Sequence, residues 1–451
     1  MARGDLAIRG ARVVLADREA DLDVIVRSGR IASLVEPDSG SAVEEIDARG
    51  LVVLPGAVDM HVHFNEPGRT EWEGWARGTA GAAAGGTTTV ADMPLNSIPA
   101  TLDGTAFDLK RVAGERSAIV DFALWGGLCP GYERRLRDLA TRGAVGVKAF
   151  LADSGVPEFP RLPEGAMPDA LRAAAEAGLL VAVHAEDEAT VNERTAKLRK
   201  RGKDRASWAA SRPPEAERRA VERAVAAARE AEAAVHVVHL GSADALAPLR
   251  AARARGMRIT AETCPHYLAF DESDVKRLGP ALKCAPPIRD AGNREALWRA
   301  VREGEIEHVA SDHSPCAAEE KTKGERDIFL AWGGVSGVQS LLPAMLTEGA
   351  ARGFGLVAIA RLVATAPARL LGLHPRKGEI REGADADLAL VDPTRAWTLE
   401  AAALQTASGI SPYVGRAFTG QVVRTIVRGT TVYLDGQVVG RPGTGRFVRP
   451  S

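Results

Sequence analysis

Eight short apolar runs within residues 55–375 constrain the fold of this 451-residue chain more than any other feature. Stretches rich in Ala, Arg and Glu separate the runs, which is the pattern of βα units around a parallel sheet. The number of runs favours an α/β fold of the (β/α)8 (TIM) barrel type, although a doubly wound open sheet produces a similar alternation. The runs are AVDMHVHF, TTTVADM, AIVDFALWG, AVGVKAF, LLVAVHA, AVHVVHL, RITAETC and EHVASDH.

The two ends of the chain differ from this middle region. Residues 1–54 alternate short β-type runs with turn residues, and residues 376–451 do the same without a long helical pattern. We therefore expect one small β-sandwich domain, built from residues 1–54 and 376–451, beside a barrel over residues 55–375.

Composition excludes several classes of partner. A net charge of −1 offers no field that would attract nucleic acid or an anionic membrane. The basic stretch RTAKLRKRGKDR lies in a region where both signs of charge alternate with alanine, which is typical of a solvated outer helix. We therefore expect neither nucleic acid nor a membrane as a partner. Four widely spaced cysteines without a CxxC pair, and the lack of a long apolar segment, predict a cytoplasmic protein.

The first apolar run carries two histidines. Side chains on a strand alternate between faces, so His61 and His63 point the same way, together with Asp59. By itself this HxH pattern describes two satisfied core histidines more often than a metal site.

Four later runs, AVGVKAF, LLVAVHA, AVHVVHL and EHVASDH, also carry polar or charged residues near their carboxyl ends. The carboxyl ends of barrel strands form the active-site face, and such groups are costly to bury alone. Nitrogen and oxygen ligands of this kind suit zinc or a similar divalent ion. The residues are Lys148, His184, His239, Asp312 and His313.

Lys148 is the unusual member of this group, because an ammonium would be repelled by divalent cations. Its place inside the apolar run AVGVKAF predicts burial, where a lysine can lose its proton and react. A CO₂ adduct would turn it into a carbamate with two ligand oxygens.

The motifs HVHFNEPG, VKAFLADSG, VAVHAED, VVHLGS, AETCPHYL, KCAPPIRD and SDHSPC, in this order, resemble the cyclic-amidohydrolase branch of the amidohydrolase superfamily. That branch includes dihydroorotases, hydantoinases (dihydropyrimidinases) and allantoinases, and the resemblance covers nearly the whole chain. It implies a barrel flanked by a β-sandwich, and commonly a homotetramer. Within the branch, DMPLNSIPAT, LKCAPPIRD, AWGGVSGVQS and SPYVGR look most like allantoinases.

The resemblance also implies the roles of single residues. Asp312 would be catalytic, moving a proton from the attacking water to the departing nitrogen of a cyclic amide. The site would hold two divalent metal ions, expected to be Zn²⁺. His61, His63 and Asp312 would bind the first ion, and His184 and His239 the second. Lys148, as N6-carboxylysine, would bridge the two ions.

Substrate choice depends on residues outside the metal set. Dihydroorotases that resemble this chain carry an arginine at the position of Asn65, and hydantoinases carry a tyrosine at that of Asp153. Hydantoinases also tend to have Asn-Gly-Val where this chain has Gly-Gly-Val at residues 333–335. These differences favour hydrolysis of allantoin to allantoate, with Asn65, Asn96 and Ala285 as expected substrate contacts.

Other interpretations stay open at this point. Hydantoinase (dihydropyrimidinase) and dihydroorotase activities are the alternatives, and a non-catalytic hydantoinase-like scaffold protein is a remote one. His266 and His313 could line the pocket, although a structural role is at least as common for each. Cys316 follows the last run, but a thiol nucleophile is not expected beside a complete metal set.

Overall fold

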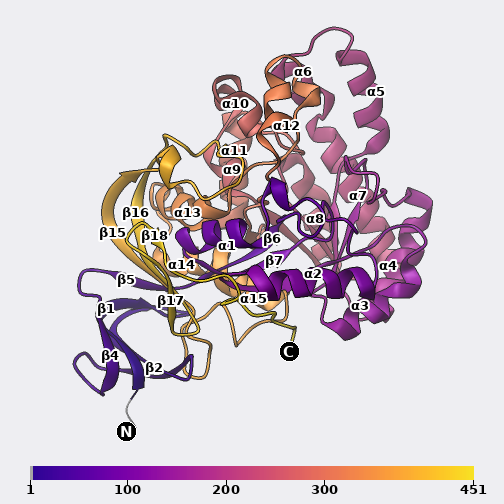
Figure 1. Cartoon of the computed structure of the whole chain (residues 1–451). Coiled ribbons are helices and arrows are strands. Elements are labelled where there is room, and N and C mark those ends of the chain that lie inside the picture. Colours follow the sequence, from indigo (N-terminus) through magenta and orange to yellow (C-terminus); the bar gives the residue numbers. More distant parts are fainter. Residues whose placement is uncertain (1–3) are drawn as a thin grey trace.

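The computed structural model describes residues 4–451, and strands from both ends of that range pair in one nine-stranded sheet (Figure 1). The order is β18-β17-β16-β15-β5-β1-β2-β3, and β4 pairs with β1 outside this row. The indigo and yellow strands of Figure 1 therefore share one sheet. The strands are β1 (Gly4–Val14), β2 (Glu19–Arg27), β3 (Arg30–Val35), β4 (Ala42–Asp47), β5 (Val52–Pro55), β15 (Leu388–Thr398), β16 (Ala417–Val427), β17 (Thr430–Leu434) and β18 (Gln437–Val438).

The seam between the two ends of the chain is the antiparallel pair β5 and β15. Val53 lies opposite Leu390, and Leu54 lies opposite Ala389. All four side chains are buried, so apolar packing adds to the ladder of hydrogen bonds. A β-rich unit drawn from both ends is confirmed, except that residues 1–3 lie outside the described residues. Its division into two sandwich layers and the domain bounds stay predictions.

The strands of the middle region run parallel and follow sequence order in two sheets, β6-β7-β8 and β9-β10-β11-β12-β13-β14. Each of the eight predicted runs contains one strand, and the third also reaches the start of β9. Their residues are almost all buried, as expected for parallel strands covered on both faces. The strands are β6 (Ala57–Val62), β7 (Thr87–Asp92), β8 (Asp121–Leu124), β9 (Gly126–Gly127), β10 (Val147–Phe150), β11 (Val181–His184), β12 (Val235–Val237), β13 (Ile259–Thr263) and β14 (His308–Val309).

Main-chain contacts connect the two parallel sheets at both of their junctions. At the first junction, the N–H of Val145, two residues before β10, donates to the carbonyl of Leu124 at the end of β8 at 3.0 Å. Beyond β14, His313 forms an isolated parallel bridge with Val62, and its carbonyl accepts the N–H of His63 at 2.7 Å. The expectation of parallel strands in sequence order is confirmed, whereas continuous pairing around a closed barrel stays a prediction.

Helices join the parallel strands. Most of them lie on the side away from the nine-stranded sheet, whereas the helices Trp75–Ala84, Leu341–Ala350 and Leu356–Ala360 pack against that sheet (Figure 1). In α7, alanines at helical spacing are buried while most of the charged residues between them reach solvent. No helix among the described residues is both long and apolar enough to cross a membrane. The helices are α1 (Trp75–Ala84), α2 (Gly104–Ser117), α3 (Leu136–Arg142), α4 (Met167–Glu176), α5 (Glu188–Leu198), α6 (Arg205–Ser211), α7 (Pro214–Ala231), α8 (Leu246–Arg253), α9 (Pro265–Ala269), α10 (Glu272–Leu278), α11 (Ala291–Arg302), α12 (Ala318–Thr322), α13 (Leu341–Ala350), α14 (Leu356–Ala360) and α15 (Ala366–Leu370).

A buried lysine ties the nine-stranded sheet to the parallel strands. The Nζ of Lys377 lies 2.5 Å from Asp121 on β8, 2.6 Å from Asp387 and 2.9 Å from Asp385, just before β15. Arg428, between β16 and β17, also pairs with Asp121. Because an unpaired charge in the interior costs several kcal/mol, each member of this cluster depends on the others.

We predict that Lys377→Met lowers the free energy of unfolding by about 3–5 kcal/mol, because it removes the cation that pairs with the buried carboxylate of Asp387 and one of the cations that pair with Asp121. The matched control is Arg218→Met, which removes an exposed ion pair with Glu222 and should cost less than about 1 kcal/mol. Urea unfolding followed by circular dichroism measures both. Equal losses in the two variants would contradict this role of Lys377.

Candidate metal centre and active site

The end of β6 directs one aspartate and two histidines to the same side. Asp59, His61 and His63 alternate along the chain with apolar residues, and all three are buried. The Oδ1 of Asp59 accepts the N–H of Ser311 at 3.0 Å and that of His61 at 3.3 Å. Asp59 thereby attaches the strand that carries the histidines to the segment that carries Asp312.

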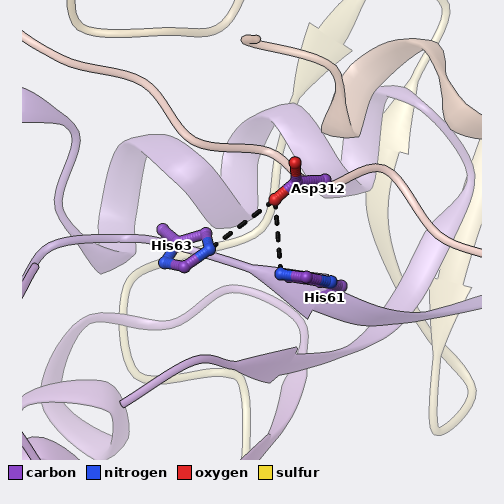
Figure 2. A group of neighbouring side chains, drawn as sticks. All are labelled: His61, His63 and Asp312. Carbon is purple, nitrogen blue, oxygen red and sulfur yellow. Dashed lines mark ion pairs between the residues drawn. The ribbon is translucent and has the colours of Figure 1, made fainter. Parts of the chain in front are cut away.

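Asp312 follows β14 and faces the two histidines (Figure 2). Its Oδ1 lies 3.3 Å from the Nε2 of His61 and 3.7 Å from the Nε2 of His63. One potential ligand atom from each of the three residues lies within 4.8 Å of the other two. The structure thus brings together the residues predicted for the first metal, although they come from the first and last strands of the middle region.

Electrostatics favours cation binding at this point. Burial tends to raise the pKa of Asp312, but His61 and His63 beside its carboxylate hold that pKa at about 2. Burial lowers the pKa of His63 to about 4. At neutral pH an ionised carboxylate and an imidazole with a free lone pair therefore face one another, which is a donor set that suits a divalent ion such as zinc.

The residues predicted for the second metal adjoin the first set. The Nδ1 of His184, at the end of β11, lies 3.0 Å from the Nε2 of His239. The Nε2–H of His184 donates to Glu186 at 2.8 Å, which leaves the Nδ1 lone pair directed towards His239. The rings of His239 and His61 lie 5.4 Å apart between centroids, so the two sets form one cluster.

Lys148, on β10, is fully buried, and its Nζ has no hydrogen-bond partner among the described residues. Burial lowers the pKa of Lys148 to about 8, although Asp312 and Glu262 act in the opposite direction. A larger share of this amine is therefore neutral near physiological pH than in an exposed lysine, and a neutral amine can react with CO₂. The surroundings of Lys148 fit the predicted modification, which stays a prediction.

The cluster also contains histidine nitrogens that have no hydrogen-bond partner in the described part of the chain. They include the Nε2 of His61 and the Nδ1 of His239. A buried polar atom without a partner costs about 1–3 kcal/mol. Coordination of a cation would offset this cost at the Nε2 of His61, so the residues present fit a metal centre.

The backbone is strained at four of the predicted site residues. Asn65, Asn96, His239 and Asp312 have φ angles of 64°, 69°, 40° and 46°, in the left-handed region that residues other than glycine seldom adopt. Such conformations persist where the surrounding structure enforces them, and they concentrate at functional sites.

A cavity of about 300 Å³ opens onto the cluster. Asn96, Ala285 and Asp153 line it as well. Asn65 is not among its lining residues: it is fully buried, and its Nδ2 donates to the carbonyl of Pro315 at 3.2 Å. A direct contact between Asn65 and substrate stays a prediction. All six predicted ligands line the cavity, namely His61, His63, Lys148, His184, His239 and Asp312.

Three further residues were weaker candidates for the site: His313, His266 and Cys316. His313 uses both ring nitrogens, one 3.2 Å from Glu73 and the other accepting a main-chain N–H, which favours a structural role. His266 is buried, and neither of its ring nitrogens has a hydrogen-bond partner among the described residues. Burial raises the pKa of the Cys316 thiol to about 11, which argues against a thiolate nucleophile.

Comparison with known proteins agrees with this geometry. The family model described as "Amidohydrolase family" matches residues 52–432. The chain belongs to the amidohydrolase family.

Curated relatives of this amidohydrolase match over nearly the full length of both chains. An allantoinase of Rubrobacter xylanophilus is 50% identical, over 100% of this chain and 98% of that protein. An allantoinase of Solibacter usitatus is 47% identical, over 99% and 97%. Among solved structures, the L-hydantoinase (dihydropyrimidinase) from Arthrobacter aurescens has a TM-score of 0.96 at 33% identity, covering 99% of this chain and 100% of that one.

Two buried lysines that sequence reasoning missed hold the cavity wall of this amidohydrolase. The Nζ of Lys321 donates to the carbonyls of Trp332 (2.9 Å), Lys283 (3.3 Å) and Gly334. The Nζ of Lys283 donates to the carbonyl of Ala331 at 2.5 Å. These bonds tie together two loop segments that both line the cavity. Lys283 lies in the motif KCAPPIRD quoted above, but nothing in that motif indicates which carbonyl groups the lysine contacts, and Lys321 lies in none of the quoted motifs.

Sequence reasoning also missed the carboxylates behind the histidines. Glu262 accepts the Nδ1–H of His61, and Glu186, paired with Arg212, accepts from His184. Both glutamates lie in the motifs quoted above, AETCPHYL and VAVHAED. The general rule that a ligand histidine donates its outer N–H to a carboxylate could have suggested them.

We predict that Lys321→Met speeds amide hydrogen exchange in residues 331–334 by at least about 10-fold, because hydrogen bonds to a charged group contribute about 1.5–3 kcal/mol each. Burial lowers the pKa of Lys321 to about 8, so the ammonium is present at pH 7, where exchange is followed by mass spectrometry.

The control for this measurement is Lys323→Met, which removes an exposed ammonium paired with Glu320. Its exchange in residues 331–334 should stay close to that of the parent. The same acceleration in both variants would show that Lys321 does not hold the wall.

Proposed function

We propose that this amidohydrolase hydrolyses the cyclic amide of allantoin to give allantoate, a step of purine catabolism. One observation carries the proposal: identities of 50% and 47% to allantoinases over nearly the full length of both chains. The fold alone would not select this reaction, because one architecture supports many chemistries. The predicted ligand residues, which share one cavity, supply the chemistry that it requires.

The proposed centre contains two divalent cations. The family supports dependence on divalent metal, and imidazole and carboxylate donors support zinc in particular. The first cation would be held by His61, His63 and Asp312 and the second by His184 and His239, with carbamylated Lys148 between them.

When bound, the cations supply Lewis acidity to the amide carbonyl and make water acidic enough to lose a proton near neutral pH. Asp312, kept ionised by His61 and His63, would accept that proton. It would then transfer the proton to the ring nitrogen as the C–N bond breaks and the carbonyl carbon becomes a carboxylate. General acid and base catalysis of this kind contributes roughly 10²- to 10⁴-fold in rate.

The cavity supports a small neutral substrate. Its volume of about 300 Å³ lies at the small end of ligand pockets. Asn96 and Ala285 line it and are proposed as direct contacts, with Asn65 behind the wall. Arg212 also lines it but is paired with Glu186. A substrate carboxylate would therefore not find an unpaired arginine there.

The test is a side-by-side hydrolysis assay on allantoin, hydantoin, dihydrouracil and dihydroorotate with metal-loaded protein. Allantoin should give the highest kcat/KM, and the kcat/KM for dihydroorotate should be at least about 10²-fold lower. The reason is that a site that leaves the charged group of a substrate unpaired discriminates strongly against that substrate. Asp312→Asn, as a control for contaminating enzymes, should lose at least about 10²-fold on every substrate. Faster hydrolysis of dihydroorotate or plain hydantoin would refute the proposed specificity.

Hydantoinase activity is the second candidate. The likeness to the hydantoinase from Arthrobacter aurescens, at 33% identity, favours it. Two observations argue against it. The identities to allantoinases are higher, and Asp153 lines the cavity at the position where hydantoinases carry a tyrosine. The complete set of ligand residues argues against a non-catalytic scaffold.

We predict that Lys148→Ala loses most of its bound metal and its activity, because the bridge between the two proposed cations is gone. A short carboxylate such as propionate, added to this variant, should restore part of both by occupying the vacant position. Metal analysis and turnover on allantoin measure the effect. Full metal content and full rate in the unrescued variant would remove Lys148 from the centre.

The finer structural and cellular assignments are proposals as well. The bridge between Val62 and His313 supports a closed (β/α)8 barrel. The seam between β5 and β15 supports a β-sandwich from residues 1–54 and 376–451 beside a barrel over residues 55–375. Four free, buried cysteines support a cytoplasmic location. A homotetramer stays an expectation from the family resemblance.

A further inference from the structure

Glu262, on β13, lies behind the cluster of histidines and is fully buried. One carboxylate oxygen, Oε1, accepts the Nδ1–H of His61 at 2.5 Å and the main-chain N–H of His239 at 3.2 Å. The ring of His61 therefore has its outer nitrogen on Glu262, while its Nε2 faces Asp312. One oxygen atom thus contacts a residue from each of the two proposed metal positions.

The other oxygen of Glu262 has its own partner. Oε2 lies 3.2 Å from the Nε2 of His236, whose Nδ1 lies 2.8 Å from the hydroxyl of Thr260. A carboxylate can only accept, so the Nε2 of His236 carries the proton, and its Nδ1 accepts from the hydroxyl when the imidazole is neutral. His236 lies on β12, the strand that precedes His239, and Glu262 lies on the neighbouring strand β13. These hydrogen bonds therefore hold the carboxylate of Glu262 against β12.

The main chain at His239 needs such a support. Its φ of 40° is strained for a residue other than glycine, and the hydrogen bond from its N–H to Glu262 holds that conformation. The ring of His239 is thereby kept 5.4 Å from that of His61 between centroids. A change at Glu262 would act on both rings at once.

We propose that Glu262 is a positioning residue for both metal positions: it fixes the tautomer and orientation of His61 and the backbone that presents His239. The inference rests on the proposed metal centre. His184 has a separate support, since its Nε2–H donates to Glu186, which Arg212 holds in turn. Carboxylates of this kind commonly raise metal affinity roughly 10- to 100-fold.

The first test is a metal titration of Glu262→Gln in competition with a chromophoric chelator, using Zn²⁺ alone. Affinity at both positions should fall by roughly 10- to 100-fold, because an amide accepts more weakly than a carboxylate. The matched control is Glu73→Gln, which alters a buried carboxylate on His313, a histidine outside the ligand set. That control should bind Zn²⁺ within about 3-fold of the parent. Equal affinities in the two variants would overturn the proposal.

The second test uses the unaltered protein, so it does not depend on how a variant folds. Histidine-selective ¹⁵N labelling should show a strongly hydrogen-bonded Nδ1–H on His61 that persists when Zn²⁺ is added, because Glu262 keeps this nitrogen while Nε2 binds metal. Loss of that resonance on Zn²⁺ addition would overturn the proposal. The first test measures zinc affinity and the second the protonation of His61, so neither outcome depends on whether allantoin is the substrate.

Discussion

The pairing between the end of β6 and the chain beyond β14 decides where the whole cluster lies. The bridge from Val62 to His313 and the carboxylate of Asp59, which accepts the N–H of Ser311, bring the last strand beside the first. Asp312 then faces the histidines of β6. Because parallel strands present their carboxyl ends at one rim, the strands between them deliver the other residues to the same place, namely Lys148, His184 and His239.

Holding these groups together is costly, and the surrounding structure offsets the cost. The cluster combines strained backbone with buried nitrogens that have no hydrogen-bond partner among the described residues. Glu262 and Glu186 hold the imidazoles by hydrogen bonds, while Lys283 and Lys321 hold the part of the cavity wall near residues 331–334. The buried cluster around Lys377 attaches this scaffold to the nine-stranded sheet. Site and scaffold thus depend on paired interior charges.

Sequence reasoning recovered what depends on periodicity. Alternation along a strand placed His61 and His63 on one face, and the ends of apolar runs identified Lys148 and Asp312. It could not determine contacts that depend on three-dimensional packing. Asn65 follows β6 but is not among the residues that line the cavity: its Nδ2 donates to Pro315, and its φ of 64° departs from the extended backbone on which the alternation depends. Glu262 was visible within a motif, but nothing in the pattern gave its direction.

The sequence also could not predict that the parallel strands divide between two sheets. The third apolar run changes partner within a few residues, from β7 to β10, and the last strand spans just His308–Val309 before its chain bridges to β6. Periodicity finds apolar runs but not the hydrogen bonds between them. The alternation of β-type runs with turn residues likewise predicted a β-rich unit from both ends of the chain, but not the order of its strands.

The central claim is that this cluster holds two metal ions and a modified lysine. Anomalous X-ray diffraction at the zinc edge, from crystals grown with Zn²⁺ and bicarbonate, tests it most directly. The account predicts two peaks per chain within about 2.0–2.3 Å of ligand atoms. One would lie at His61, His63 and Asp312 and the other at His184 and His239, with carbamate density on Lys148. A single peak, or two peaks with an unmodified lysine between them, would contradict it.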